Sequence, residues 1–271
     1  MSYSGIVHKV NLYEGNPARY VWQVGLDTID LNAYIGKTLH IKYSGHIVCL
    51  ACAAVTNKSY NQGFCYECFS KLARNDQCVM NPHLCHYHLG TCREPSWGLT
   101  HCMNKHLVYL AWTSNLKVGI TKVINQPTRW LDQGAIAAVP VCYTQTRYHA
   151  GLVEEFLKAH YADRTNWRGM LKPQVIDVDR LATEQRMACN RIKEHSFSEE
   201  VVSGLRFLEV NVRRFEYPLP EFFPALKSIN LDKTNTFSSK LLGMKGQYLY
   251  LEDGVFNVRR HTGYAVDLAF V

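Results

Sequence analysis

Residues 107–121 read LVYLAWTSNLKVGIT, and this stretch decides the fold expected for the middle of the chain. The apolar run Leu107–Ala111 is typical of a buried strand, and Lys117–Thr121 indicates a second one. The residues between the two runs include Ser114-Asn115, a pair that suits a hairpin turn. The sequence therefore predicts a β-hairpin here.

Helices and strands alternate after this hairpin. Pro127 indicates the start of a helix over Arg129–Ala138. A third strand is predicted over Val141–Gln145 and a second helix over His149–Tyr161, whose apolar residues recur at helical spacing. The polar residues 176–200 predict further helix.

Both ends of the chain predict β-structure. Tyr20–Val24 indicates a short strand, and apolar and polar residues alternate over Leu39–Tyr43 and again from Arg206. Residues 241–266 carry glycines among tyrosines and valines, which predicts strands joined by tight turns. Neither end can bury enough surface to be stable alone, so we expect the two ends to pack together or against the middle.

These patterns predict an α+β fold. A small mixed α/β core follows an N-terminal metal-binding region, and β segments flank both. The expected parts are residues 1–45 (N-terminal β segment), 46–106 (zinc-binding region), 107–175 (mixed core) and 176–271 (helical connector and C-terminal β segment).

The overall composition is that of a globular protein. Of the 271 residues, 47% are apolar and 20% charged, which excludes a disordered or low-complexity chain. No stretch approaches about 18 uncharged apolar residues, and the N-terminus lacks the pattern of a secretory signal. We therefore expect a cytoplasmic protein without a membrane span, whose thiols stay reduced. The net charge of +7 is compatible with a polyanionic partner.

The cysteines are concentrated in one region, since eight of the ten fall between Cys49 and Cys102. Cys49-x2-Cys52 is followed by Cys65-x2-Cys68, and two such turns can complete a tetrahedron of four sulfurs around structural zinc. An iron–sulfur cluster is the alternative metal centre, and four reduced core cysteines the alternative without metal.

A second zinc site is predicted from the next stretch. Its expected ligands are Cys78, Cys85, Cys92 and Cys102, and a histidine can replace one thiol. The candidate histidines are His86, His88 and His106. Residues 46–106 contain few large aliphatic residues, so metal–thiolate bonds, at about 10–16 kcal/mol per structural zinc, would supply stability that the core cannot.

Five polar residues in and after the hairpin suit phosphodiester chemistry. Tyr109 can relay a proton from an attacking water, and Lys117 can stabilise negative charge or act as a base. Arg129 presents a planar fork to phosphate oxygens. Glu154 can hold Mg²⁺ or Mn²⁺, and Asn166 follows twelve residues later.

In this order, the residues resemble the GIY-YIG nuclease superfamily over about a quarter of the chain. Val108-Tyr109-Leu110 stands at the GIY position, and Lys117-Val118-Gly119 stands at the YIG position with lysine in place of the usual tyrosine. The resemblance implies that Arg129 lies on the first helix, that Glu154 binds the catalytic metal and that Asn166 closes the site. It makes residues 107–175 a GIY-YIG-like domain.

The whole chain also resembles an uncharacterised bacterial family that carries a cysteine-rich region before such a core. The segments that carry this likeness are Gly90–Pro95, Arg129–Ala135 and Gly246-Gln247-Tyr248.

Each of the five residues also has a structural interpretation when taken alone. Tyr109 suits a core position, Lys117 and Arg129 a solvated face, and Asn166 a helix cap or turn. Glu154 can pair with Lys158, and the neighbouring Glu155 is the competing metal ligand.

Three functions follow from these alternatives. The first is a metal-dependent nuclease that acts on DNA or structured RNA, and the second is a zinc-stabilised nucleic-acid-binding protein that cuts nothing. A nucleic-acid partner is expected in both, supported by a net charge of +4 over residues 107–175, where eight basic residues face four acidic ones. A zinc-dependent hydrolase is the least favoured, because four-sulfur sites leave no position open for water.

Overall fold

The strands at the two ends of the chain pair with each other. In the computed structural model, which describes residues 1–271, strand β1 (Ser2–Tyr13) lies antiparallel to β15 (Tyr264–Phe270), with Ser2 opposite Ala269. The prediction that both ends pack together is therefore confirmed. The α+β fold class is also confirmed.

The chain forms two compact units. The terminal unit comprises residues 1–70 and 215–271, and the middle unit comprises residues 71–214. These units divide the chain differently from the four expected parts, because the predicted zinc-binding region 46–106 is shared between them. The short helix α1 (Tyr66–Lys71) lies at the division. None of the helices is both long and apolar enough to span a bilayer.

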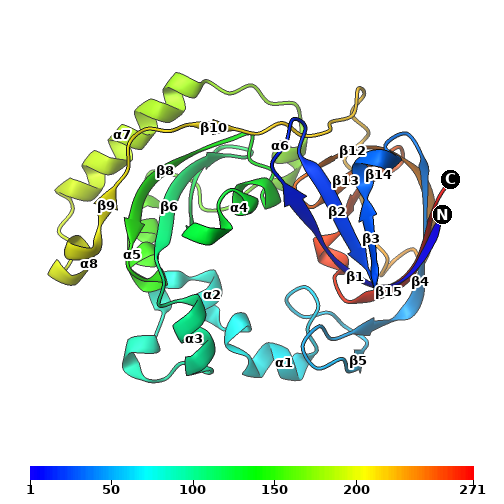
Figure 1. Ribbon diagram of the computed structural model, residues 1–271, viewed down its shortest axis with the longest axis horizontal. Helices are drawn as coiled ribbons and strands as arrows, with labels where there is room; N and C mark the ends of the chain where they lie inside the picture. The colour runs from blue at the N-terminus through cyan, green and yellow to red at the C-terminus, as the bar shows by residue number, and fades with distance from the viewer. The chain divides into compact units, whose positions relative to one another are not determined.

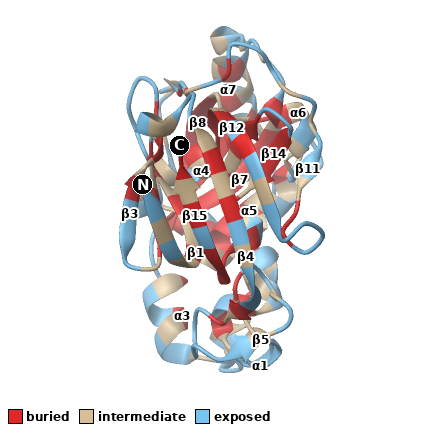
Figure 2. Cartoon of the chain, turned by 90° about the vertical axis from the view of Figure 1, so that its right-hand side faces the viewer, coloured by how far each residue is buried: buried red, intermediate tan, exposed pale blue.

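A ten-stranded sheet forms the terminal unit. Its order is β11-β14-β13-β12-β4-β15-β1-β2-β3, with β5 paired to β4. The remaining strands are β2 (Arg19–Val24), β3 (Asp27–Asp30), β4 (Thr38–Val48), β5 (Val55–Thr56), β11 (Ser228–Ile229), β12 (Thr236–Lys245), β13 (Tyr248–Leu251) and β14 (Gly254–Asn257). Leu39 and Ile41 of β4 are buried while their sequence neighbours are more exposed, and Figure 2 shows these bands along the strand. Alternation of this kind is what a sheet with one buried face requires.

The middle unit holds a smaller sheet in the order β10-β8-β6-β7, with β9 also paired to β8. Its strands are β6 (His106–Trp112), β7 (Leu116–Lys122), β8 (Ala137–Thr144), β9 (Arg206–Phe207) and β10 (Arg213–Arg214). Its helices are α2 (Gln77–Met80), α3 (Pro95–His101), α4 (Thr128–Asp132), α5 (Arg147–Leu157), α6 (Trp167–Leu171), α7 (Val178–Glu194) and α8 (Glu199–Gly204). The predicted hairpin is present as β6 and β7, and residues 176–200 are largely helical, as expected.

The two faces of this smaller sheet have different surroundings. Val108, Leu110 and Val118 point toward α5 and α7, where they share one apolar cluster with Val153 and Leu181. Figure 1 shows both helices running along that side of β6 and β8. Because strand residues alternate between faces, the residues between these apolar positions lie on the opposite face. Tyr109 is one of them.

Two details of the middle unit differ from the expectation. The first helix ends at Asp132 rather than Ala138, because Gly134 adopts a φ of +69° and stops it. Pro140 lies inside β8 rather than before it, next to a register irregularity in the pairing of β8 with β6.

Candidate functional site

Backbone hydrogen bonds position the first pair of cysteines, Cys49 and Cys52, at the end of β4. Cys49 is buried and follows directly after β4. The backbone N–H of Leu50 donates to the carbonyl of Gly63 at 2.8 Å, and the Cys49 N–H donates to Ala54 O at 2.9 Å. These bonds bring the segment that carries Cys65 next to the loop that carries Cys52.

The four sulfurs of Cys49, Cys52, Cys65 and Cys68 lie within 4.8 Å of one another. Those of Cys52 and Cys65 are 3.8 Å apart. A tetrahedron with metal–sulfur bonds of about 2.3 Å separates its sulfurs by about 3.8 Å. The Cys68 N–H also donates to the Cys65 sulfur at 3.5 Å. The predicted first cluster is therefore assembled, and it can bind a metal ion.

The electrostatics of this cluster favour a cation. Burial raises the pKa of Cys49, but hydrogen bonds from the backbone of Cys65, Cys52 and Ala51 outweigh it and lower the value to about 6. Burial and the neighbouring thiols raise the pKa of Cys68. One thiolate therefore opposes the ionisation of the next, and a bound divalent cation would relieve that repulsion.

The second set of cysteines also comes together. One pocket in the middle unit is lined by Ala73, Asp76, Cys78, Cys85, His86, Tyr87, Cys92, Trp97 and Cys102. Hydrogen bonds from the thiols of Cys102 and Cys78 lower the pKa of Cys85 to about 2. The pKa values of Cys78 and Cys102 are raised by the same contacts.

Of the three candidate histidines, only His86 borders this pocket. His88 is exposed, with its ring centroid 5.0 Å from that of Tyr148. His106 is fully buried at the start of β6, and its Nδ1 lies 2.8 Å from the carbonyl oxygen of Asn104. The histidine alternatives therefore narrow to His86.

Tyr109 is positioned by the hairpin and by α4. It is buried on β6 directly opposite Gly119 of β7, and Trp130 of α4 packs edge-on against its ring at 5.6 Å. A Cβ at position 119 would lie 2.7 Å from the Tyr109 hydroxyl oxygen. The second triplet of the sequence motif therefore needs its glycine to make room for the tyrosine of the first.

Sequence reasoning missed Gln133. Its Nε2 donates to the Tyr109 hydroxyl oxygen at 2.6 Å and to the Arg129 carbonyl at 3.0 Å. The available signal was its position four residues after Arg129, which places both on one side of a helical turn. Gln133 thus fixes the tyrosine hydroxyl from the same helix that carries the arginine.

Arg129 and Glu154 each act on the pKa of Tyr109 and on that of Lys117. Lys117 and Arg129 in turn act on the pKa of Glu154, which links the four residues in one electrostatic group. Burial raises the pKa of Tyr109, while Arg129 acts to lower it. Burial, followed by the charge of Arg129, lowers the pKa of Lys117 to about 8. At neutral pH the group therefore contains a protonated phenol and an easily deprotonated ammonium.

Glu154, rather than Glu155, is the carboxylate of this group. Burial raises the pKa of Glu154 against the nearby charges of Lys158 and Arg147. Glu155 is exposed, and its carboxylate binds Lys158 at 2.7 Å and His83 at 3.1 Å. The ion pair with Lys158 that was suggested for Glu154 is thus made by Glu155, although the charge of Lys158 still acts on Glu154.

Asn166 has a structural role in the chain. It is the N-cap of α6, and its side-chain oxygen accepts hydrogen bonds from the N–H groups of Arg168 at 3.1 Å and Gly169 at 3.2 Å. This arrangement matches the capping alternative that the sequence left open. Of the five residues, four are linked by electrostatic interactions, and the fifth serves as a helix cap.

The group of four joins a phenol, two cations and a carboxylate. Arg129 is exposed and can meet an anion from solvent, whereas Tyr109 and Lys117 are buried behind it. Such a set suits the binding of a phosphate and the movement of a proton beside it.

Comparison with known proteins places the chain in a family. No curated protein and no solved structure matches it. One family model, described as a protein of unknown function (DUF2797), matches residues 36–266, which include both cysteine clusters and the group of four. The match covers most of the chain, and the protein therefore belongs to the DUF2797 family.

Proposed function

We propose that the protein is a metal-dependent nuclease that hydrolyses phosphodiester bonds in DNA or structured RNA. The observation that carries the proposal is that Tyr109 and Lys117 are diagonal neighbours on the hairpin and that Arg129 and Glu154 both influence their pKa values. The likeness to the GIY-YIG superfamily gives these residues a common reaction. The net charge of +7 suits a polyanionic substrate.

The exposed Arg129 is proposed to hold the phosphate through two parallel N–H donors. Lys117 is a diagonal neighbour of Tyr109 on the hairpin, because Tyr109 opposes Gly119 and Lys117 opposes Ala111. In its neutral form, Lys117 would take the proton that the attacking water passes through the Tyr109 hydroxyl. The water oxygen would form a bond to phosphorus as the bond from phosphorus to the leaving oxygen breaks, and the leaving oxygen would take a proton from solvent.

Glu154 is proposed to hold Mg²⁺ or Mn²⁺. A half-buried carboxylate fits these hard cations, which commonly take one or two protein oxygens and complete their shell with water and phosphate. The ion would polarise the phosphate and stabilise the leaving oxygen.

The four cysteines at 49, 52, 65 and 68 are proposed to bind zinc in a structural role. A site of four sulfurs is closed, and it leaves no position for a reacting water. This supports a role for zinc in folding rather than in the reaction.

The second candidate function is a nucleic-acid-binding protein that retains the fold without cleavage. The specific observation in its favour is that the oxygen of Asn166 is occupied in capping α6. Lysine at position 117, where the superfamily has tyrosine, also suits phosphate binding.

Labelled DNA and RNA substrates, single-stranded and branched, incubated with Mn²⁺ would separate the two candidates. Cleavage by the wild type that is lost in Glu154→Gln and kept in the matched variant Glu155→Gln is the expected result. Binding should persist in both variants. Nucleic-acid binding without cleavage by the wild type would favour the second candidate, and neither binding nor cleavage would refute both.

A further inference from the structure

Helix α5 rests on the backbone of the cysteine-rich segment. Gly151 lies in the middle of α5, and a Cβ added there would come within 2.5 Å of the carbonyl carbon of Pro82 and into the backbone of His83. The helix and the 3-10 turn η3 (Pro82–Leu84) are therefore in backbone contact. Because the two backbones touch, neither α5 nor η3 can move without breaking this contact.

Polar contacts join both the first residue and the last turn of α5 to the cysteine-rich segment. The Arg147 guanidinium donates to the Val79 carbonyl at 2.6 Å, and the Arg147 N–H donates to the Cys102 carbonyl at 2.8 Å. Glu155 meets His83 at 3.1 Å. Residues 71–102, which carry Cys78, Cys85, Cys92 and Cys102, thus form the surface against which α5 packs, and this segment is called the seat of α5 below.

This seat has little apolar core of its own. Between residues 71 and 101, its regular structure consists of helices of seven residues or fewer, namely η2 (Ala73–Asn75), α2, η3, η4 (Tyr87–Leu89) and α3. Several of its large aliphatic side chains, those of Met80, Leu84 and Leu89 among them, are exposed. A segment of this kind cannot offset its chain entropy by apolar burial, so a cross-link must supply the stability.

The thiols are arranged to provide that cross-link. Cys78, Cys85, Cys92 and Cys102 all line one pocket, and the thiols of Cys78 and Cys102 both influence the pKa of Cys85. All four are free thiols. The cavity between them is about 10 Å³, room for about one water-sized sphere.

We propose that Cys78, Cys85, Cys92 and Cys102 bind one zinc ion, and that this ion holds the seat on which α5 is docked. The site lies within the middle unit and is independent of the cluster at Cys49. Because Glu154 is on α5, the ion also fixes the position of that carboxylate, a consequence that matters for catalysis only if the proposed nuclease function holds.

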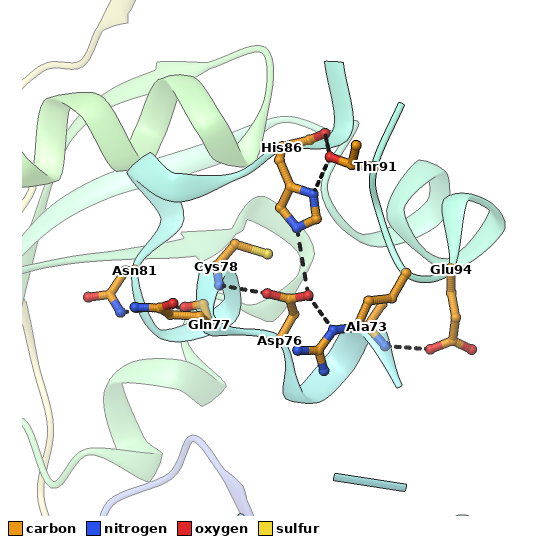
Figure 3. Close-up of polar contacts among 9 residues, drawn as sticks. Ala73, Asp76, Gln77, Cys78, Asn81, His86, Thr91 and Glu94 are labelled. Atoms are coloured by element: carbon orange, nitrogen blue, oxygen red, sulfur yellow. Dashed lines mark hydrogen bonds and ion pairs between the residues drawn. The ribbon is translucent and has the colours of Figure 1, made fainter. Parts of the chain in front are cut away.

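The ligand atoms of Asp76, Cys78 and His86 lie within 4.8 Å of one another, so His86 is the competing ligand. Cys92 is assigned to the set instead, because both ring nitrogens of His86 face other partners. Its Nδ1 is 2.7 Å from the Thr91 hydroxyl, and its Nε2 faces Asp76 at 3.6 Å. Asp76 in turn accepts from the Cys78 N–H at 3.3 Å and binds Arg93 at 2.6 Å. Figure 3 shows the Asp76 carboxylate joined by dashed lines to His86 and to Cys78. His86 and Asp76 therefore form an outer layer that orients the thiolate ligands.

The ligand set is tested by metal counting on the full chain under native mass spectrometry. The wild type should carry two zinc ions. Cys78→Ser and Cys92→Ser should each carry one, and His86→Ala should keep two. Loss of the ion from His86→Ala with retention in Cys92→Ser would overturn the ligand set, and one ion in the wild type would overturn the site. Replacement by Co²⁺ gives a second readout, since four thiolates produce intense sulfur-to-cobalt absorption.

The seat is tested by amide hydrogen exchange. In Cys92→Ser, the amides of residues 151–157 should exchange at least tenfold faster, whereas those of α7 in the same unit should not change. Cys52→Ser is the matched control, because it removes only the first ion and should leave α5 protected. Unchanged exchange in α5 after loss of the second ion would overturn the seat. None of these readouts depends on cleavage, so failure of the nuclease proposal leaves the test intact.

Discussion

The burial of Lys117 should cost the protein stability that a neutral side chain would restore. Lys117 is 8% exposed, and its pKa falls from an ordinary 10.5 to about 8 because of burial and then the charge of Arg129. Each unit of pKa difference is worth about 1.4 kcal/mol, so the shift corresponds to about 3 kcal/mol. Lys117→Met, which keeps most of the apolar stem, should raise the free energy of unfolding at pH 7 by up to about that amount.

The sign of the pH dependence follows from the direction of the shift. Below pH 8 the lysine is charged in both the folded and the unfolded chain, so its full cost is present. Between about pH 8 and 10.5 the unfolded chain holds a proton that the folded chain has lost, and the wild type therefore gains stability as the pH rises. The advantage of Lys117→Met should shrink through this window and vanish above it.

Urea unfolding of the wild type and Lys117→Met from pH 6.5 to 10.5 measures this difference, and subtraction cancels the other titrating groups. Lys172→Met, at an exposed position, is the control and should change stability by less than about 0.5 kcal/mol. This prediction would be refuted if Lys117→Met were less stable than the wild type and the difference in free energy of unfolding did not vary with pH. The ammonium would then be paired with a negative charge rather than buried without one.

Four further outcomes are expected. Gly119→Ala should lose about 1–3 kcal/mol by urea unfolding, because its Cβ would press on the Tyr109 hydroxyl. Tyr109→Phe should lose no more than about 1.5 kcal/mol, as the Gln133 bond is removed, yet lose nearly all cleavage in a substrate assay. Cys49→Ser should lower the zinc content by one ion, measured by elemental analysis. Thr146→Ala should cost about 1 kcal/mol in thermal unfolding, since its hydroxyl caps α5.

The local patterns of the sequence determined much of the middle unit. The apolar run at 107–111 and the run at 117–121 are the strands β6 and β7, because strands buried on both faces read as continuous apolar residues. The spacing of Cys49, Cys52, Cys65 and Cys68 was sufficient to identify the first cluster, since paired turns carry their own geometry. Helix ends were predicted less well, because a single glycine conformation at position 134 stopped α4.

Only the tertiary structure decided which distant groups meet. The pairing of β1 with β15 joins residues about 260 positions apart, and no local pattern encodes such a partner. Gln133 contacts the Tyr109 hydroxyl because α4 packs on the hairpin. Asn166 caps a helix because the residues after it fold as α6. Cys92 was the expected ligand and a histidine its possible replacement, and the fold brings both Cys92 and His86 to the same pocket. Sequence spacing fixes geometry over a turn or a strand, whereas the choice among partners depends on packing between elements that have no fixed separation along the chain.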